Sequence, residues 1–120
     1  MRYITFVKMA ESVGDPPPAL VEAMGKELEQ AFAEGTMIQA GGLAGMRDST
    51  EIRLAGGSIT QTDGPYAEGK EVVGGYAITE VRSHEEAVEG ARRVIELHRE
   101  YWPGWEGSVE IRQMFDSQDQ

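Results

Sequence analysis

The sequence predicts a single α+β domain in which two helices pack on one face of an antiparallel sheet. Two segments carry apolar residues at helical spacing, and several others alternate in the manner of strands. The segments follow one another as strand, helix, strand, hairpin, strand, helix, strand. A chain of 120 residues has room for one core, so we expect one domain over residues 1–120.

The first strand is expected over residues 3–9. Alternation places Tyr3 and Val7 on one face and Ile4 and Phe6 on the other. Because helices can cover only one face of such a sheet, the other face would expose large apolar groups to water. We therefore expect a twofold homodimer that buries this face, the alternative being an alternation that is merely imperfect.

The first helix is expected from about residue 18 to 34. Proline is tolerated in a first helical turn, where its missing N–H would have no partner, and Gly35 can end the helix in the left-handed conformation. Apolar residues recur every three or four positions and are expected to form one buried stripe: Leu20, Met24, Leu28, Ala31 and Phe32.

Three short strands and a longer one are expected next. A strand over 36–42 ends in glycines, and runs over 50–55 and 58–62 flank Gly56-Gly57, which is a two-residue hairpin signal. After a turn, residues 72–81 supply the bulk of another strand.

The second helix is expected to begin at Ser83 and to end before Pro103. Ser83 and Glu86 have the spacing of a capping box, in which each side chain accepts a hydrogen bond from a backbone N–H. The apolar positions of this helix are Ala87, Val88, Ala91, Val94, Ile95 and Trp102.

A last strand is expected over residues 107–115, followed by a polar tail over 116–120. Without the extra hairpin, the order of elements is the βαββαβ pattern of a ferredoxin-like sheet with both helices on one face.

Charge and composition exclude several classes of function. The formal net charge is −10, from 21 acidic and 11 basic residues, so the chain lacks the basic surface that binds nucleic acid or an anionic membrane. It has no cysteine, which excludes disulfides, thiolate metal sites and a cysteine nucleophile. Two histidines fourteen positions apart make a weak metal site, and we expect neither a metal nor a cofactor. With no signal peptide and no apolar run of about 20 residues, the expected location is cytoplasmic.

Two segments carry a family resemblance. From Thr62 to Glu71 the chain reads TDGPYAEGKE, followed by Gly74-Gly75-Tyr76, and from Trp102 to Gly107 it reads WPGWEG. These segments resemble the YCII-related, or DGPF-domain, family, in a branch with the second motif near its C-terminus. Tyr66 stands where that family more often has phenylalanine.

The resemblance implies a ferredoxin-like α+β fold that pairs into a dimeric α/β barrel. It implies less about function. Members have been linked to lyase-like chemistry on small molecules, and some resemble partners encoded beside sigma factors of the extracytoplasmic type. In the smaller YCII branch, a histidine in the first helix and an aspartate are the proposed active pair. The first helix of this chain has no histidine, so that role is not carried over.

His98 and Asp63 are the candidate catalytic residues. On a helical projection His98 lies near the centre of the apolar arc, so it should point at the sheet or a pocket and could move a proton near neutral pH. Asp63 could orient that ring. The structural alternatives are a core histidine satisfied by one hydrogen bond and an aspartate that sets its own turn.

Four further residues are candidates for substrate binding. Tyr66, Trp102 and Trp105 could line an apolar pocket, and Arg112 could hold an anionic group. Packing roles for the aromatic residues and an ion pair for Arg112 are the alternatives.

The sequence leaves open whether the protein is an enzyme. The first hypothesis is a homodimer that binds a small organic molecule between sheet and helices and carries out cofactor-free acid–base chemistry, such as isomerisation or elimination. The second is a non-catalytic accessory protein, for instance a regulatory partner of a sigma factor.

Overall fold

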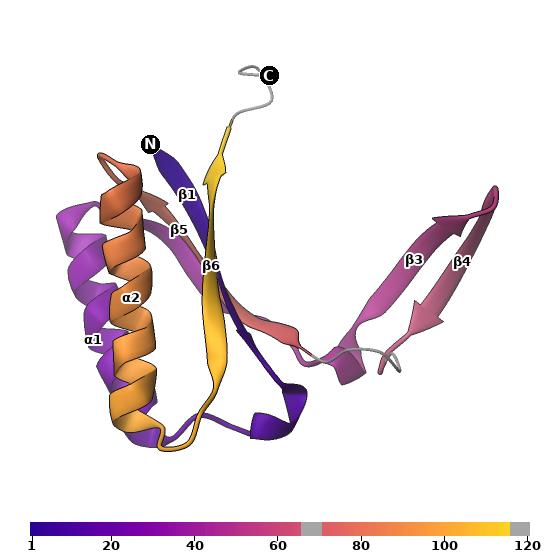
Figure 1. Cartoon of the computed structure of the whole chain (residues 1–120), viewed down its shortest axis with the longest axis horizontal. Helices are drawn as coiled ribbons and strands as arrows, with labels where there is room; N and C mark the ends of the chain where they lie inside the picture. Colours follow the sequence, from indigo (N-terminus) through magenta and orange to yellow (C-terminus); the bar gives the residue numbers. More distant parts are fainter. Residues whose placement is uncertain (66–70, 116–120) are drawn as a thin grey trace.

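A computed structural model describes residues 1–65 and 71–115. It contains a body, made of a four-stranded sheet and two long helices, and a two-stranded hairpin that forms a sheet of its own (Figure 1). The chain therefore has the α+β class that the sequence predicts.

The sheet of the body is antiparallel throughout. It consists of β1 (Arg2–Met9), β2 (Met37–Gly42), β5 (Val72–Glu80) and β6 (Gly107–Met114), in the order β2-β5-β1-β6. When the hairpin is left out, the first and third strands of a βαββαβ unit lie in the middle. This order is compatible with a ferredoxin-like sheet.

Both helices cover the same face of the sheet (Figure 1). Thr5 of β1 lies on this face, opposite Ala77 of β5 and Ile111 of β6. The next residues along each strand point the other way and no helix covers them. We call this second surface the open face, and its centre is formed by four half-buried apolar residues, which are Ile4, Phe6, Tyr76 and Ile78.

The two helices begin and end as their sequences predict. Helix α1 (Pro18–Glu34) starts with proline and stops at Gly35, whose φ of 80° is left-handed. Helix α2 (His84–Tyr101) is capped by Ser83, whose hydroxyl accepts a hydrogen bond from the N–H of Glu86 at 3.1 Å. The Glu86 carboxylate accepts a return bond at 3.2 Å from Arg82, one residue before the cap.

Among the described residues the buried apolar core is small, consisting of Tyr3, Leu20, Ala87 and Leu97. The expectation that Phe32 belongs to the buried stripe of α1 is wrong, because its side chain is exposed. Each step of four residues turns about 40° around a helix, so Phe32 lies about 120° from Leu20 and has left the covered side.

The hairpin consists of β3 (Thr50–Ala55) and β4 (Ser58–Asp63), and we call it the arm. Its turn is formed by Gly56-Gly57, both with positive φ, as a tight two-residue hairpin requires. The arm projects from the body on the side away from the helices (Figure 1). It extends the molecule: the radius of gyration is 16.2 Å, against about 14 Å for a compact chain of this length.

Two single-turn 3₁₀ helices, η1 (Glu11–Val13) and η2 (Met46–Asp48), lie in the connections. The polar tail predicted for residues 116–120 lies outside the described residues. Among the described helices, none has both the length and the apolar character needed to cross a bilayer.

Candidate functional site

Asp63 lies at the base of the arm, where the two strands join the body. Its Oδ1 atom accepts a hydrogen bond of 3.0 Å from the hydroxyl of Thr50, the residue directly opposite it in the arm. The next residue, Gly64, donates its N–H to the carbonyl of Ser49 at 2.7 Å. Within a single chain, therefore, the Asp63 side chain links the open ends of the two strands of the arm. Tyr66 lies outside the described residues.

Gly64 is required at this place by the packing of the backbone. A Cβ atom at position 64 would overlap the carbonyl group of Met46 in η2, which is backbone and has no rotamer in which to withdraw. The Asp-Gly pair of the central motif thus joins the two ends of the arm to each other and packs closely against η2.

His98 is buried at the last turns of α2, with 6% of its surface exposed. Its Nδ1 atom lies 2.8 Å from the carbonyl oxygen of Val94, one helical turn earlier. Because a carbonyl oxygen only accepts, Nδ1 carries the hydrogen of this bond. In the neutral ring, Nε2 is then an acceptor, and it makes no hydrogen bond to any described residue.

The tautomer of His98 is a testable consequence. We expect ¹⁵N NMR at a basic pH, where imidazole side chains are neutral, to show His98 in the tautomer with hydrogen on Nδ1, because the Val94 carbonyl holds that hydrogen. The exposed His84, on the same helix, is the internal control and should show the mixture of an unconstrained imidazole. A His98 ring protonated only at Nε2 would contradict the hydrogen bond to Val94.

Two tryptophans enclose the ring of His98. The Trp105 ring lies 4.4 Å from it between centroids and the Trp102 ring 6.3 Å, the latter nearly parallel. The indole N–H of Trp105 is buried and has no hydrogen-bond partner among the described residues. A shallow hollow of about 390 Å³ adjoins this cluster, lined by Ile95, Arg99, Trp102, Gly104, Trp105, Glu106 and Gly107.

The described structure does not bring the other candidates to His98. Arg112 lies on the open face, where it is opposite Ile4, and its guanidinium is 3.5 Å from the Glu110 carboxylate. His98 belongs to α2, which covers the opposite face of the sheet, so the sheet lies between the two residues (Figure 1). Asp63 is bonded within the arm. The structure thus gathers His98, Trp102 and Trp105 and leaves Arg112 and Asp63 elsewhere in the chain.

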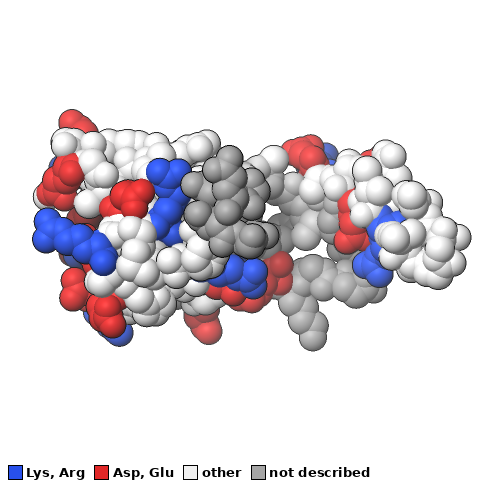
Figure 2. Space-filling view, turned by 90° about the horizontal axis from the view of Figure 1, so that it is seen from above, with Lys and Arg blue, Asp and Glu red and all other residues white. Residues whose placement is uncertain are grey.

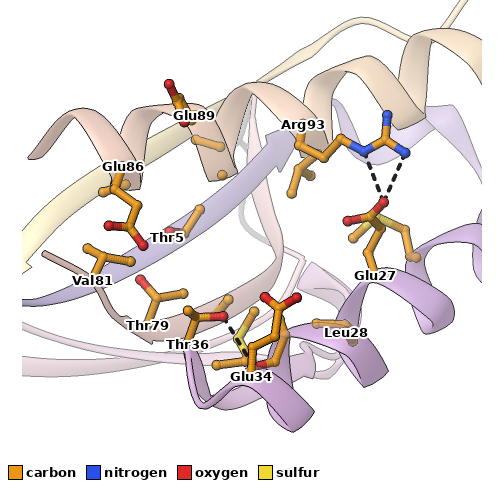
Figure 3. Close-up of a pocket in the computed structure, with 18 of the residues that line it drawn as sticks. Thr5, Glu27, Leu28, Glu34, Thr36, Thr79, Val81, Glu86, Glu89 and Arg93 are labelled. Carbon is orange, nitrogen blue, oxygen red and sulfur yellow. Dashed lines mark hydrogen bonds and ion pairs between the residues drawn. The ribbon is translucent and has the colours of Figure 1, made fainter. Parts of the chain in front are cut away.

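Another cavity, made of two adjoining chambers, lies between the helices and the sheet, and we call it the interlayer cavity. Its main chamber measures about 380 Å³ and is bounded by α1, α2 and strands β1, β2 and β5 (Figure 3). A second chamber of about 240 Å³ adjoins it. The two chambers share six of their lining residues, which are Thr5, Met24, Leu28, Met37, Ala77 and Val94.

Small side chains on the sheet create this cavity. Gly75, Ala77 and Thr79 occupy successive helix-facing positions of β5, and Thr5 lies beside them on β1. Larger residues there would fill the space beneath the helices. Of the sequence candidates that the structure describes, none belongs to this lining. The sequence signal for this cavity was the run of small residues at alternate positions of β5. Small side chains on the helix-facing side of a strand leave space beneath the helices.

The floor and the mouth of the interlayer cavity differ in chemistry. The hydroxyls of Thr5 and Thr79 lie in the floor, and neither hydrogen-bonds another described residue. At the mouth, Glu27 Oε1 accepts a hydrogen bond of 2.9 Å from Nε of Arg93 and forms an ion pair with its Nη2 at 2.9 Å, which joins α1 to α2 (Figure 3). This carboxylate raises the pKa of Arg93.

The carboxylates of Glu34 and Glu86 lie at the same mouth, and Glu89 also belongs to the lining but directs its carboxylate outward (Figure 3). Within residues 1–65 and 71–115, no three carboxylates or imidazoles are arranged to hold a metal ion. The cavity is therefore an apolar chamber with a few hydroxyls and an acidic entrance.

Comparison with known proteins identifies the family. The model of the YCII-related domain matches residues 1–101. No significant match was found among the curated proteins. The match spans most of the chain, including the whole arm and both long helices, and so the chain belongs to the YCII-related family.

Proposed function

We propose that this protein is a homodimer that binds a small, mainly apolar organic molecule in the interlayer cavity. The observation that carries the proposal is the unfilled space between the layers. A well-packed domain leaves few voids larger than a water molecule, whereas here two adjoining chambers of about 380 and 240 Å³ share a lining. Ligand pockets of small molecules typically begin at about 300 Å³.

The lining defines the kind of ligand that fits. Met24, Leu28 and Leu97 offer apolar contact from the helices, and the hydroxyls of Thr5 and Thr79 offer hydrogen bonds from the sheet. A ligand with an aromatic or branched apolar body and one or two polar groups would satisfy both.

The replacement Ala77→Leu tests this proposal. Its side chain would enter the cavity, so we expect binding of small aromatic probes such as benzene and indole to weaken about tenfold or more. We expect the free energy of unfolding to stay level or to rise by about 1 kcal/mol, because a filled cavity stabilises a core. Amide chemical shifts of Thr5 and Val94, recorded during probe titration, report the binding.

Ile78→Leu is the matched control, since it changes the neighbouring residue on the open face. It should leave probe binding unchanged. If wild-type shifts around Thr5 do not respond to either probe, or if Ala77→Leu is strongly destabilised, the space is not a binding cavity.

His98 is the residue proposed to move a proton. Its buried ring is oriented by the Val94 carbonyl, which supplies the positioning that the sequence assigned to Asp63. This leaves Nε2 free to accept a proton from a bound molecule in a cofactor-free isomerisation or elimination. His98 itself does not line the interlayer cavity, but its neighbours Val94 and Leu97 on α2 do, so a substrate held there would have to extend past these two side chains to reach Nε2.

For any compound found to be turned over, His98→Gln should lower the rate by about 10²–10⁴-fold, the usual contribution of a general base. His84→Gln, an exposed histidine of the same helix, is the control and should leave the rate unchanged. Circular dichroism would confirm that both variants fold. An unchanged rate and unchanged ligand binding in His98→Gln would refute this role.

The open face supports the dimeric barrel. Its apolar centre is bordered by paired charges: Lys8 lies 2.8 Å from Glu110, and Arg2 lies 3.4 Å from Glu80. The hydrogen bond from the Lys8 ammonium lowers the pKa of Glu110, which favours the charged form of this carboxylate. In contrast to the chain as a whole, this border is not strongly acidic, and two copies can approach through it without large repulsion.

The helix layer favours a second candidate function, that of an accessory protein such as a regulatory partner of a sigma factor. Helices α1 and α2 carry nine glutamates against four basic residues, an excess of five negative charges. Acidic side chains are spread over the body in Figure 2. A basic protein segment could bind this layer. Salt-dependent binding of a polylysine peptide at the helices, with no probe binding in the cavity, would favour this function.

A further inference from the structure

One face of the arm carries three branched apolar residues, together with Gln61 and, at the base, the Thr50–Asp63 pair. Leu54 and Ile59 lie directly opposite one another, and Ile52 shares their side of the ribbon. The other side carries Glu51 and Arg53. The three apolar side chains are among the most exposed in the described chain, at 70% for Ile52, 72% for Leu54 and 73% for Ile59.

Such a ribbon is unfavourable in water by itself. An isolated two-stranded hairpin is marginally stable at best, and it needs a further strand or a packed surface to support it. The body supplies no such surface, because the arm forms a separate sheet and all six residues of β4 are exposed. A cluster of exposed branched apolar residues on a projecting ribbon is typical of a surface that another molecule covers.

The position of the arm indicates which molecule covers it. The arm projects from the body on the side of the sheet opposite to the helices, which is the side of the open face (Figure 1). A second copy seated on the open face would therefore lie on the same side as the arm, next to the apolar centre formed by Ile4, Phe6, Tyr76 and Ile78.

The charge distribution also favours a second copy. Two chains of net charge −10 repel one another unless their contact surfaces lack this excess. The arm has two acidic residues, Glu51 and Asp63, and one basic residue, Arg53, so it contributes only one negative charge. Its apolar side chains are uncharged. The arm and the open face are thus parts of the molecule from which the acidic excess is largely absent.

We propose that the arm is a clasp: the face formed by Ile52, Leu54 and Ile59 packs on a second copy of the chain that is docked on the open face. This inference rests on the homodimer of the proposed function, but it is independent of the interlayer cavity and its ligand. It assigns the arm to assembly, and the Asp63–Thr50 bond and the close packing of Gly64 on η2 then belong to the base of this clasp.

The experiment uses two single-cysteine variants, Leu54→Cys and Arg53→Cys. The native chain has no cysteine, so each introduced thiol is the only one. The two positions are adjacent in β3 and point to opposite sides of the ribbon. Both side chains are exposed in the single chain. The rate of reaction with a thiol reagent is measured across a dilution series, with the oligomeric state of each sample measured by analytical ultracentrifugation.

We expect the thiol at position 54 to react about tenfold or more slowly in the dimer than in the dilute monomer, and the thiol at position 53 to react equally in both. Equal reactivity of position 54 in dimer and monomer would overturn the clasp while leaving the dimer intact. A chain that is monomeric at every concentration would overturn both. Either result would leave probe binding in the cavity as a separate question.

A pair of triple variants provides a second measurement. Ile52→Ser, Leu54→Ser and Ile59→Ser together should raise the dimer dissociation constant about a hundredfold or more, since each copy loses three buried apolar side chains. Glu51→Ser, Arg53→Ser and Thr60→Ser change the opposite side of the ribbon without altering net charge, and should leave the constant nearly unchanged. Equal dissociation constants for the two triple variants would contradict the clasp.

Discussion

Gly107→Ala is expected to lower the free energy of unfolding by about 3 kcal/mol and to displace Trp105 from His98. A Cβ atom at position 107 would overlap both the carbonyl of Lys8 and the ring of Trp105. Lys8 belongs to β1, where it pairs with Ser108 of β6. Its carbonyl therefore cannot move away without disturbing the sheet. The Trp105 indole must therefore move, and its contact with the His98 ring is then lost.

Denaturant unfolding and tryptophan emission measure the two effects. We expect a lower unfolding midpoint and a red-shifted emission, because the Trp105 indole would become more exposed to water. Gly90→Ala is the matched control: Gly90 lies inside α2 with open space around its Cα, so alanine there should stabilise the helix by about 1 kcal/mol. If both variants behave alike, Trp105 does not pack on Gly107 as described.

Phe6→Asp is expected to convert the proposed dimer into monomers, with a rise in the dissociation constant of about a thousandfold or more. The change removes an aromatic group from the centre of the open face and places a carboxylate there. In a twofold dimer each substitution acts twice, and two desolvated like charges would oppose one another across the interface.

Phe32→Asp is the matched control, because Phe32 is an exposed phenylalanine on α1 and belongs to the helix layer. It should leave the dimer intact. Sedimentation equilibrium gives both dissociation constants, and far-ultraviolet circular dichroism shows whether each variant is folded. A folded Phe6→Asp protein that is still a dimer would place the interface elsewhere than on the open face.

Much of the fold is predictable because local chemistry specifies it. The proline start and glycine stop of α1 agree with the structure to the residue, and Gly56-Gly57 forms the turn of the arm. The division of β1 into two faces also agrees, because alternation follows from strand geometry alone. Phe32 was misplaced because helical twist accumulates over several turns, which a list of apolar positions does not show.

The candidate site was predictable only in part. The burial of His98 follows from its place within the apolar arc of α2, and two tryptophans a few residues away were good candidates to lie beside it. The partner expected for His98 was Asp63, whereas the observed partner is the Val94 carbonyl, since a backbone acceptor one turn away is always within reach of a helical histidine.

The sequence by itself determined the order and type of the strands and long helices, their limits to within one or two residues, the face on which the residues of β1 lie, and the burial of His98. Tertiary structure alone decided that Arg112 and His98 lie on opposite sides of the sheet, that the arm projects away from the helices, and that the interlayer cavity exists. The physical reason is that local propensities act within a segment, whereas a cavity depends on the distance between α1, α2 and the sheet. That distance is set by how the side chains of all three pack together.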